Sequence, residues 1–353
     1  MFIWVARDKG SEWKALTALQ GKGALPVIPL IEAVCEPFLP QRNKAPLSPI
    51  AVMQNLALRL RGITRSGRVL VDLGNLTSLF SGPDVAAMLD LLFKGGAFPP
   101  HLVTPVARSS SPNALSEAVL AWAREGGAGL CVRLDGLTHL SAKKQIVDDL
   151  VSQSRIPLSM IDVVADAQDL PRAYSHEDLA SALPAGQQSR SWAVIAGTFP
   201  ASITPLKPDD YEHHRERSEW VTYVDELGRD ARWRRPMYGD YATQPAIYAP
   251  SPAFRASPSV RYTTNDGFVV LRGRGGENSS AEQYIGHARF LTTQAYFQES
   301  VATDGDAYVA KIATGNHKTG NATTWRVASL LRHVELVAHQ IATLPRVPTR
   351  RGA

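Results

Sequence analysis

Short runs of apolar residues, rich in valine, isoleucine and leucine, recur along the whole chain. They lie at residues 2–6, 26–31, 69–72, 102–107, 130–134, 158–163, 192–197 and 237–242. Each run is continuous and does not alternate with polar residues, as expected of a strand whose two faces are both buried. The pattern therefore predicts eight strands of a parallel sheet.

Amphipathic stretches with helix start and stop signals separate these runs. Ser48-Pro49 and Ser81-Gly82-Pro83 are typical N-cap signals, and Gly95-Gly96 ends the second of these stretches. Alternating strands and helices predict an α/β fold, a (β/α)8 TIM-like barrel, because right-handed crossovers place every helix outside and leave no sheet edge exposed. An open doubly wound sheet is the alternative, although no Gly-x-Gly-x-x-Gly turn follows the first run.

The pattern changes after the eighth run. Two β-like segments flank Thr264-Asn265-Asp266-Gly267, whose Asp-Gly pair suits a tight turn, so we expect an inserted β-hairpin at 259–272. It would project from the carboxyl end of the barrel, the face where barrel enzymes place their sites. The prediction is completed by helices at about 280–293 and 324–343, a single barrel domain at 1–345 and a basic tail at 346–353.

A further helix is predicted over residues 209–227. Arg215 and Glu219 are four residues apart there and would pair on one face, either as a solvated ion pair or as a pair that orients a ligand. His213 and His214 are adjacent and would point in different directions, so they do not form a zinc motif.

Polar side chains collect where the predicted strands end. Glu32, Asp72, Asp162 and Asp240 are the candidate catalytic acids, and the other polar residues at these ends are Arg7, Lys9, Arg108, Arg133 and Asp135. Such ends converge on one mouth of a barrel, where carboxylates can act as acid and base or bind a divalent metal and arginines can hold phosphate. The alternative is structural, since the chain leaves the core at these points. No cofactor is indicated beyond that possible metal.

A glycine-rich turn, Arg272-Gly273-Arg274-Gly275-Gly276, is a second candidate site. Exposed amides in such a turn can bind a phosphate or carboxylate. The alternative is a loop that needs glycine for positive φ. The turn matches neither the P-loop nor the dinucleotide fingerprint.

Composition and charge narrow the class of protein. The 353 residues carry a formal net charge of +5 and contain two cysteines, Cys35 and Cys131, each near an apolar stretch. No apolar run is long enough for a bilayer, and the first residues form no basic leader, so we expect a cytoplasmic protein that does not enter a membrane. A nucleic-acid partner is possible but less favoured, because charges of both signs are interspersed.

Several segments resemble the beta protein family of phages, satellite phages and bacterial defence islands. In the N-terminal part these are Lys9 and Glu12 with Ala15-Leu16, then Val27-Ile28-Pro29-Leu30-Ile31-Glu32 and Val69-Leu70-Val71-Asp72. In the C-terminal part they are Val260-Arg261-Tyr262-Thr263, then Leu271-Arg272-Gly273-Arg274-Gly275-Gly276, and Thr324-Trp325-Arg326 before a His-bearing helix. The chain departs from the family at Trp4-Val5-Ala6, where members tend to carry proline, and at Arg332-His333, where they tend to carry paired histidines.

This resemblance implies a component of a phage-defence or phage-exclusion module that binds a partner protein of the same gene cluster or a phosphate-bearing ligand. The alternatives are an enzyme acting on a phosphorylated or nucleotide substrate and a nucleic-acid binder that uses the tail, Arg234-Arg235 and Arg272 to Arg274. The expected ligand-binding residues are Lys9, Arg133, Arg261, Arg272, Arg274, Trp325 and Arg326.

Overall fold

The computed structural model describes residues 1–21, 27–40, 45–95, 97–169, 175–206, 212–229, 233–250, 257–275 and 280–344. The predicted basic tail at 346–353 and Gly276 of the glycine-rich turn lie outside these residues. In the part of the chain that is described, no helix combines the length and the apolar character that a membrane span requires.

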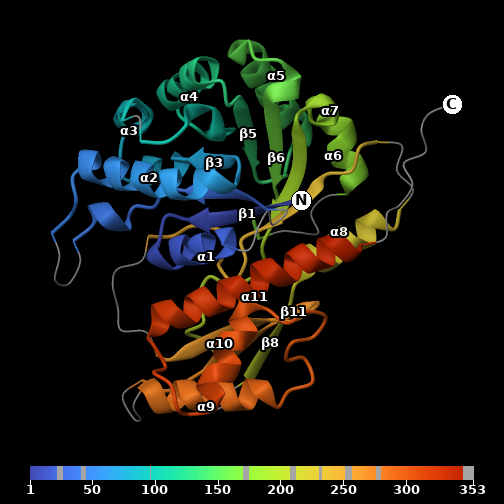
Figure 1. Cartoon of the computed structure of the whole chain (residues 1–353). Coiled ribbons are helices and arrows are strands. Elements are labelled where there is room, and N and C mark those ends of the chain that lie inside the picture. The colour runs from blue at the N-terminus through green and yellow to red at the C-terminus, as the bar shows by residue number, and fades with distance from the viewer. Residues whose placement is uncertain are drawn as a thin grey trace.

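Eight parallel strands close into a barrel in the order β1-β2-β3-β4-β5-β6-β7-β9, which confirms the predicted fold class (Figure 1). They are β1 (Phe2–Arg7), β2 (Val27–Glu32), β3 (Val69–Asp72), β4 (Val103–Arg108), β5 (Leu130–Asp135), β6 (Ile161–Asp166), β7 (Ser191–Ala196) and β9 (Met237–Asp240). Side chains alternate along each strand. Ile3 and Val5 thus join one apolar cluster, and Phe2, Trp4 and Ala6 join another that includes the surrounding helices.

Helices surround the barrel. They are α1 (Gly10–Gln20), α2 (Pro49–Ile63), α3 (Gly82–Lys94), α4 (Asn113–Gly126), α5 (Leu140–Ser154), α6 (His176–Ala182), α7 (Pro184–Gln188), α8 (Ser218–Leu227) and α11 (Ala322–Thr343). Short 3-10 helices lie at η1 (Glu36–Phe38), η2 (Thr64–Ser66), η3 (Gly74–Ser78), η4 (Pro100–Leu102) and η5 (Leu158–Met160). The predicted start of α3 is confirmed, since Ser81 accepts from the backbone of Asp84 in a capping box.

A smaller antiparallel sheet lies beside the barrel. The predicted hairpin forms as β10 (Ser259–Thr263) and β11 (Gly267–Arg272), and β8 (Glu212–Glu216) adds a third strand. These three strands with α9 (Ser280–Thr292) and α10 (Asp304–Ala313) form what we call the accessory unit (Figure 1). It has an apolar cluster of its own, which includes Trp325 of α11.

Helix α11 joins the accessory unit to the barrel. Leu330, Val334 and Val337 belong to the barrel's apolar cluster, whereas Trp325 near the start of the helix belongs to that of the accessory unit. Because β10, β11, α9 and α10 all lie between β9 and α11 in the sequence, the accessory unit is inserted on the face of the barrel where the strands end. We call this the carboxyl-end face.

The predicted helix at 209–227 is wrong in its first part. Residues Glu212–Glu216 form β8, which pairs with β11, and only Ser218–Leu227 is helical. Arg215 therefore lies on a strand and does not pair with Glu219 across a helical turn, and His213 and His214 point to opposite faces of the sheet. The five polar residues of β8 carry no apolar pattern, so pairing with β11 decides their conformation.

Candidate functional site

Arg133 at the end of β5 lies at the centre of the barrel mouth. Its guanidinium group donates to Glu32 at 2.8 Å, to Asp72 at 2.7 Å and to Asp166 at 2.7 Å, and also to the hydroxyl of Tyr241 at 2.8 Å. The side chain is 2% exposed. The carboxyl ends of four strands thus converge on one buried guanidinium.

Two more arginines complete this network. Arg108 donates to Asp72 at 2.7 Å and to Glu32 at 3.3 Å, and Arg7 lies 3.4 Å from Glu32. Gly74 leaves room for this arrangement, because a Cβ atom there would collide with Arg108. Three guanidinium groups thus face the three carboxylates of Glu32, Asp72 and Asp166.

The electrostatics of the network follow from burial and mutual attraction. Burial raises the pKa of Glu32, but Arg133, Arg108 and Arg7 together outweigh it and lower that pKa to about 2. Burial dominates at Asp166 and raises its pKa despite the attraction of Arg133. Among the described residues, no group of three or more His, Cys, Asp or Glu side chains could hold a metal ion. The carboxylates of the mouth pair with arginine side chains.

Asp162 lies at the opposite end of the barrel, so its predicted place in the mouth is wrong. It is the second residue of β6, where Arg190 approaches it at 2.7 Å and Arg68 also contacts it. The apolar run at 158–163 begins in the 3-10 helix η5, which places the strand several residues later than predicted. Asp166 is the carboxylate that β6 contributes to the mouth, and it is not among the predicted site residues.

Asp240 ends β9 and lies apart from the Arg133 network. It accepts from Tyr238 at 2.8 Å and lies 2.7 Å from Nε2 of His333, whose Nδ1 lies 3.1 Å from the hydroxyl of Thr263. Burial raises the pKa of Asp240, but His333 outweighs it and the net shift is downward. Asp240, His333 and Thr263 are linked in the same sequence of carboxylate, imidazole and hydroxyl as a catalytic triad, yet each is at most 1% exposed. They join the barrel to β10 and α11.

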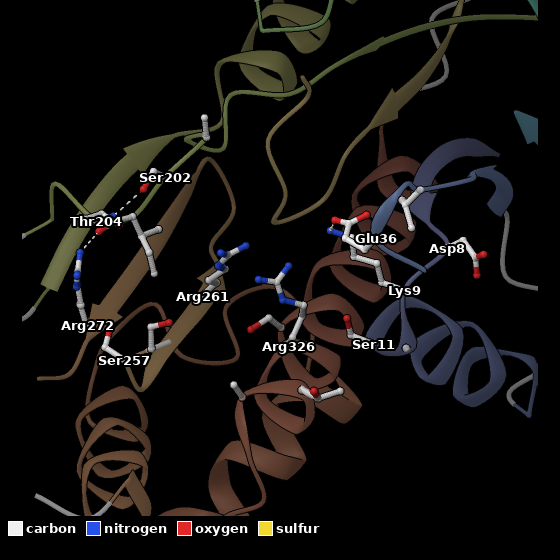
Figure 2. A pocket seen from close by; sticks show the side chains of 18 of the residues that line it. Asp8, Lys9, Ser11, Glu36, Ser202, Thr204, Ser257, Arg261, Arg272 and Arg326 are labelled. Carbon is white, nitrogen blue, oxygen red and sulfur yellow. Dashed lines mark hydrogen bonds and ion pairs between the residues drawn. The ribbon is translucent and has the colours of Figure 1, made fainter. Parts of the chain in front are cut away.

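A cavity of about 990 Å³ lies between the carboxyl-end face and the accessory unit. The loops after β1 and β2 line one side, and β10, β11 and α11 line the other (Figure 2). Four of the expected ligand-binding residues line it: Lys9, Arg261, Arg272 and Arg326. We call it the cationic cavity.

Arg261 and Arg326 face each other within this cavity (Figure 2). Arg261 donates to the carbonyl of Thr243 at 2.5 Å and lies 4.6 Å from the ring centre of Phe199. Within the described part of the chain, Arg261 contacts no carboxylate, and Arg326 makes neither a hydrogen bond nor an ion pair. Neither guanidinium group of this pair therefore contacts a carboxylate among the described residues.

Burial and like charge act on the pair in the same direction. Burial lowers the pKa of Arg261, and the neighbouring charge of Arg326 lowers it further. Burial also lowers the pKa of Arg326. The carboxylate of Glu12, which accepts hydrogen bonds from Ser11 and Gln244, raises the pKa of both arginines and so offsets part of this effect.

The other two cations of the cavity have partners. Lys9 lies 2.7 Å from Glu36, and Arg272 donates to the carbonyl of Ile203. Serine and threonine side chains lie among them, including Ser202 and Thr204 (Figure 2). Among the described residues, positive charge without a carboxylate partner therefore remains at Arg272 as well as at Arg261 and Arg326, and the last two face each other.

The remaining expected ligand-binding residues lie elsewhere. Arg133 belongs to the mouth network, and Arg274 is exposed. Trp325 is buried in the accessory unit, where it stacks on Tyr284 at 4.9 Å and donates to the carbonyl of Thr319 at 2.9 Å. A ligand in the cationic cavity would meet Arg326 but not the buried ring of Trp325.

The glycine-rich turn holds its amides differently from the expectation. The amide of Gly273 donates to the carbonyl of Pro258 at 2.6 Å, which extends the β10–β11 pairing. Gly273 does not have a positive φ. Glycine is required there because a Cβ atom would lie 2.9 Å from the oxygen of Pro258.

Comparison with curated proteins and with solved structures gave no match. The family model described as "Beta protein" matches residues 5–339, which is nearly the whole chain. The match covers the barrel, the accessory unit and most of α11. The chain therefore belongs to the beta protein family.

Proposed function

We propose that this protein is a component of a phage-defence or phage-exclusion module and that it binds a phosphate-bearing ligand in the cationic cavity. Membership of the beta protein family associates the chain with phages. The cavity lies on the carboxyl-end face, where barrels commonly bind their ligands. We also propose that the protein acts in the cytoplasm.

One observation carries the ligand class. Arg261 and Arg326 face each other without a carboxylate partner among the described residues, and guanidinium groups bind phosphate through paired hydrogen bonds. Two like charges that are partly removed from water destabilise each other unless an anion joins them. A bound phosphate would supply that anion.

The geometry favours binding over catalysis at the mouth. Glu32 and Asp72, two of the candidate acids, are held by arginines, while Asp240 is sealed against His333 and Asp162 lies at the far end. Carboxylates engaged in this way have no free oxygen to offer a divalent metal. An enzyme acting on a phosphorylated substrate remains the alternative, and it would need acids from outside this set.

Nucleic acid is a weaker proposal. Arg234 and Arg235, two of its expected contacts, donate to backbone carbonyls, Arg234 to Ser189 and Arg235 to Arg229. These guanidinium groups therefore serve the fold. A partner protein from the same gene cluster would be an alternative occupant of the carboxyl-end face.

Plaque formation in a host that carries the native gene cluster tests this proposal. The cluster with the wild-type gene should reduce plaquing of at least one phage, and Arg326→Met should restore plaquing to the level of a gene deletion. Arg65→Met is the matched control, because Arg65 is exposed on η2 far from the cavity. If deletion of the gene changes plaquing by none of the tested phages, the proposal is wrong.

A further inference from the structure

The cationic cavity also indicates which kind of phosphate it binds. We infer that the ligand is a phosphomonoester whose terminal, doubly charged phosphate lies between Arg261 and Arg326. This inference rests on the proposed function and narrows the ligand class. We do not expect a phosphodiester, such as the backbone of a nucleic acid, to be the ligand.

The charge of the two arginines favours a phosphomonoester. Each guanidinium group keeps its full positive charge under physiological conditions. A phosphomonoester carries about −1.5 to −2 charges at pH 7, whereas a diester carries one. Only the monoester can neutralise both Arg261 and Arg326.

The other charged groups limit how many phosphates the cavity can hold. Lys9 pairs with Glu36 at 2.7 Å, whereas Arg272 donates to the carbonyl of Ile203 and has no carboxylate partner among the described residues. The carboxylate of Glu12, which accepts hydrogen bonds from the neutral side chains of Ser11 and Gln244, offsets part of the positive charge of Arg261 and Arg326. One dianionic phosphate between these two arginines is therefore sufficient, and Arg272 alone does not provide a row of cations for a chain of several phosphates.

Arg261 is preorganised for binding. Arg261 is held by the carbonyl of Thr243 and by the ring of Phe199, so its guanidinium group is fixed before a ligand arrives. Arg326 projects from α11, whose position is set by Trp325 in the accessory unit and Leu330 in the barrel cluster. A tetrahedral phosphate with three terminal oxygens can accept from both groups at once, and the side chain of Arg261, which is already held, loses little conformational entropy on binding.

Two small probes that differ by one charge test this inference. Binding of methyl phosphate and dimethyl phosphate to the full-length protein would be measured by isothermal titration calorimetry at pH 7.5 and constant ionic strength. We expect methyl phosphate to bind about tenfold more tightly than dimethyl phosphate, which corresponds to one well-formed charged interaction. Arg326→Gln should abolish this preference and Arg326→Lys should retain it, while Arg65→Gln should behave as wild type.

The outcomes separate the inference from the proposed function. Equal affinity for the two probes would overturn the inference but leave phosphate binding in the cavity intact. A preference for methyl phosphate that survives in a folded Arg326→Gln variant, with folding verified by circular dichroism, would also overturn it. The second negative charge of the ligand would then be recognised at another site. No binding of either probe would overturn it too, and the plaque assay with Arg326→Met would still decide the proposed function.

Discussion

Removal of Arg133 should lower the free energy of unfolding, because Arg133 neutralises buried carboxylates at the barrel mouth. In Arg133→Met, Glu32 keeps Arg7 and Arg108, and Asp72 keeps Arg108. Asp166 loses its only guanidinium partner among the described residues and keeps the hydroxyl of Tyr241 at 2.7 Å and the amide of Gln168 at 2.9 Å. One buried carboxylate is then left without a counter-charge.

The size of the effect follows from that single carboxylate. Breaking a buried ion pair from one side costs about 3–5 kcal/mol at neutral pH. The pKa of Asp166 is already raised by burial, and loss of Arg133 raises it further above its unfolded value. A buried carboxyl group with a raised pKa destabilises the folded state more strongly as pH rises from its unfolded pKa toward its folded pKa. The loss of folding free energy in Arg133→Met should therefore shrink by up to about 1.4 kcal/mol for each unit of pH lowered from 7 toward 5.

Urea unfolding followed by circular dichroism at pH 7 and pH 5 measures both quantities. The double variant Arg133→Met with Asp166→Asn should recover part of the loss, because the unpaired charge is removed. The exposed Arg65→Met control should change stability by less than about 0.5 kcal/mol. A loss below about 1 kcal/mol at pH 7 for Arg133→Met, or a loss independent of pH, would refute this account of the network.

Three further predictions concern other buried polar groups. Glu219→Gln should stabilise the protein by up to about 3 kcal/mol at pH 8 and by little at pH 4. Burial raises the pKa of Glu219 to about 7, so its ionisation destabilises the folded protein as pH rises from about 4.5 through 7. Equal gains at both pH values in thermal unfolding would contradict this. His333→Ala should cost about 2–3 kcal/mol by removing the partner of buried Asp240, as urea unfolding would measure; an unchanged midpoint would show that the contact contributes nothing. Arg190→Met should lower the free energy of unfolding by about 1–2 kcal/mol, because Asp162 loses one of its arginine partners. Binding of methyl phosphate, measured by calorimetry, should stay unchanged. Weaker binding would place Asp162 in the ligand site.

The barrel was predictable because its strands are buried on both faces and their sequences are therefore continuously apolar. The tight turn at Asp266-Gly267 predicted the β10–β11 hairpin for an equally local reason. β8 carries no such signal, since Glu212–Glu216 is polar throughout and becomes a strand only by pairing with β11. Strand ends were uncertain by a few residues, and that error alone moved Asp162 into the mouth and hid Asp166.

The site was less predictable because it depends on contacts between distant elements. Arg261 and Arg326 were both expected to bind a ligand, yet their convergence depends on how α11 packs against β10, which neither local sequence encodes. The balance of charge around Arg133 was hidden for the same reason. Residue types at strand ends predicted that charges would gather in the mouth, but only the contacts reveal that each acid there is partnered by an arginine.

Anomalous diffraction from a crystal soaked in sodium tungstate would test the central claim most directly. Tungstate is a tetrahedral dianion, and its metal atom gives a strong anomalous signal that marks its position without ambiguity. We expect a peak between the guanidinium groups of Arg261 and Arg326 that disappears in Arg326→Gln. Peaks confined to other surfaces, with none between these two arginines, would contradict it.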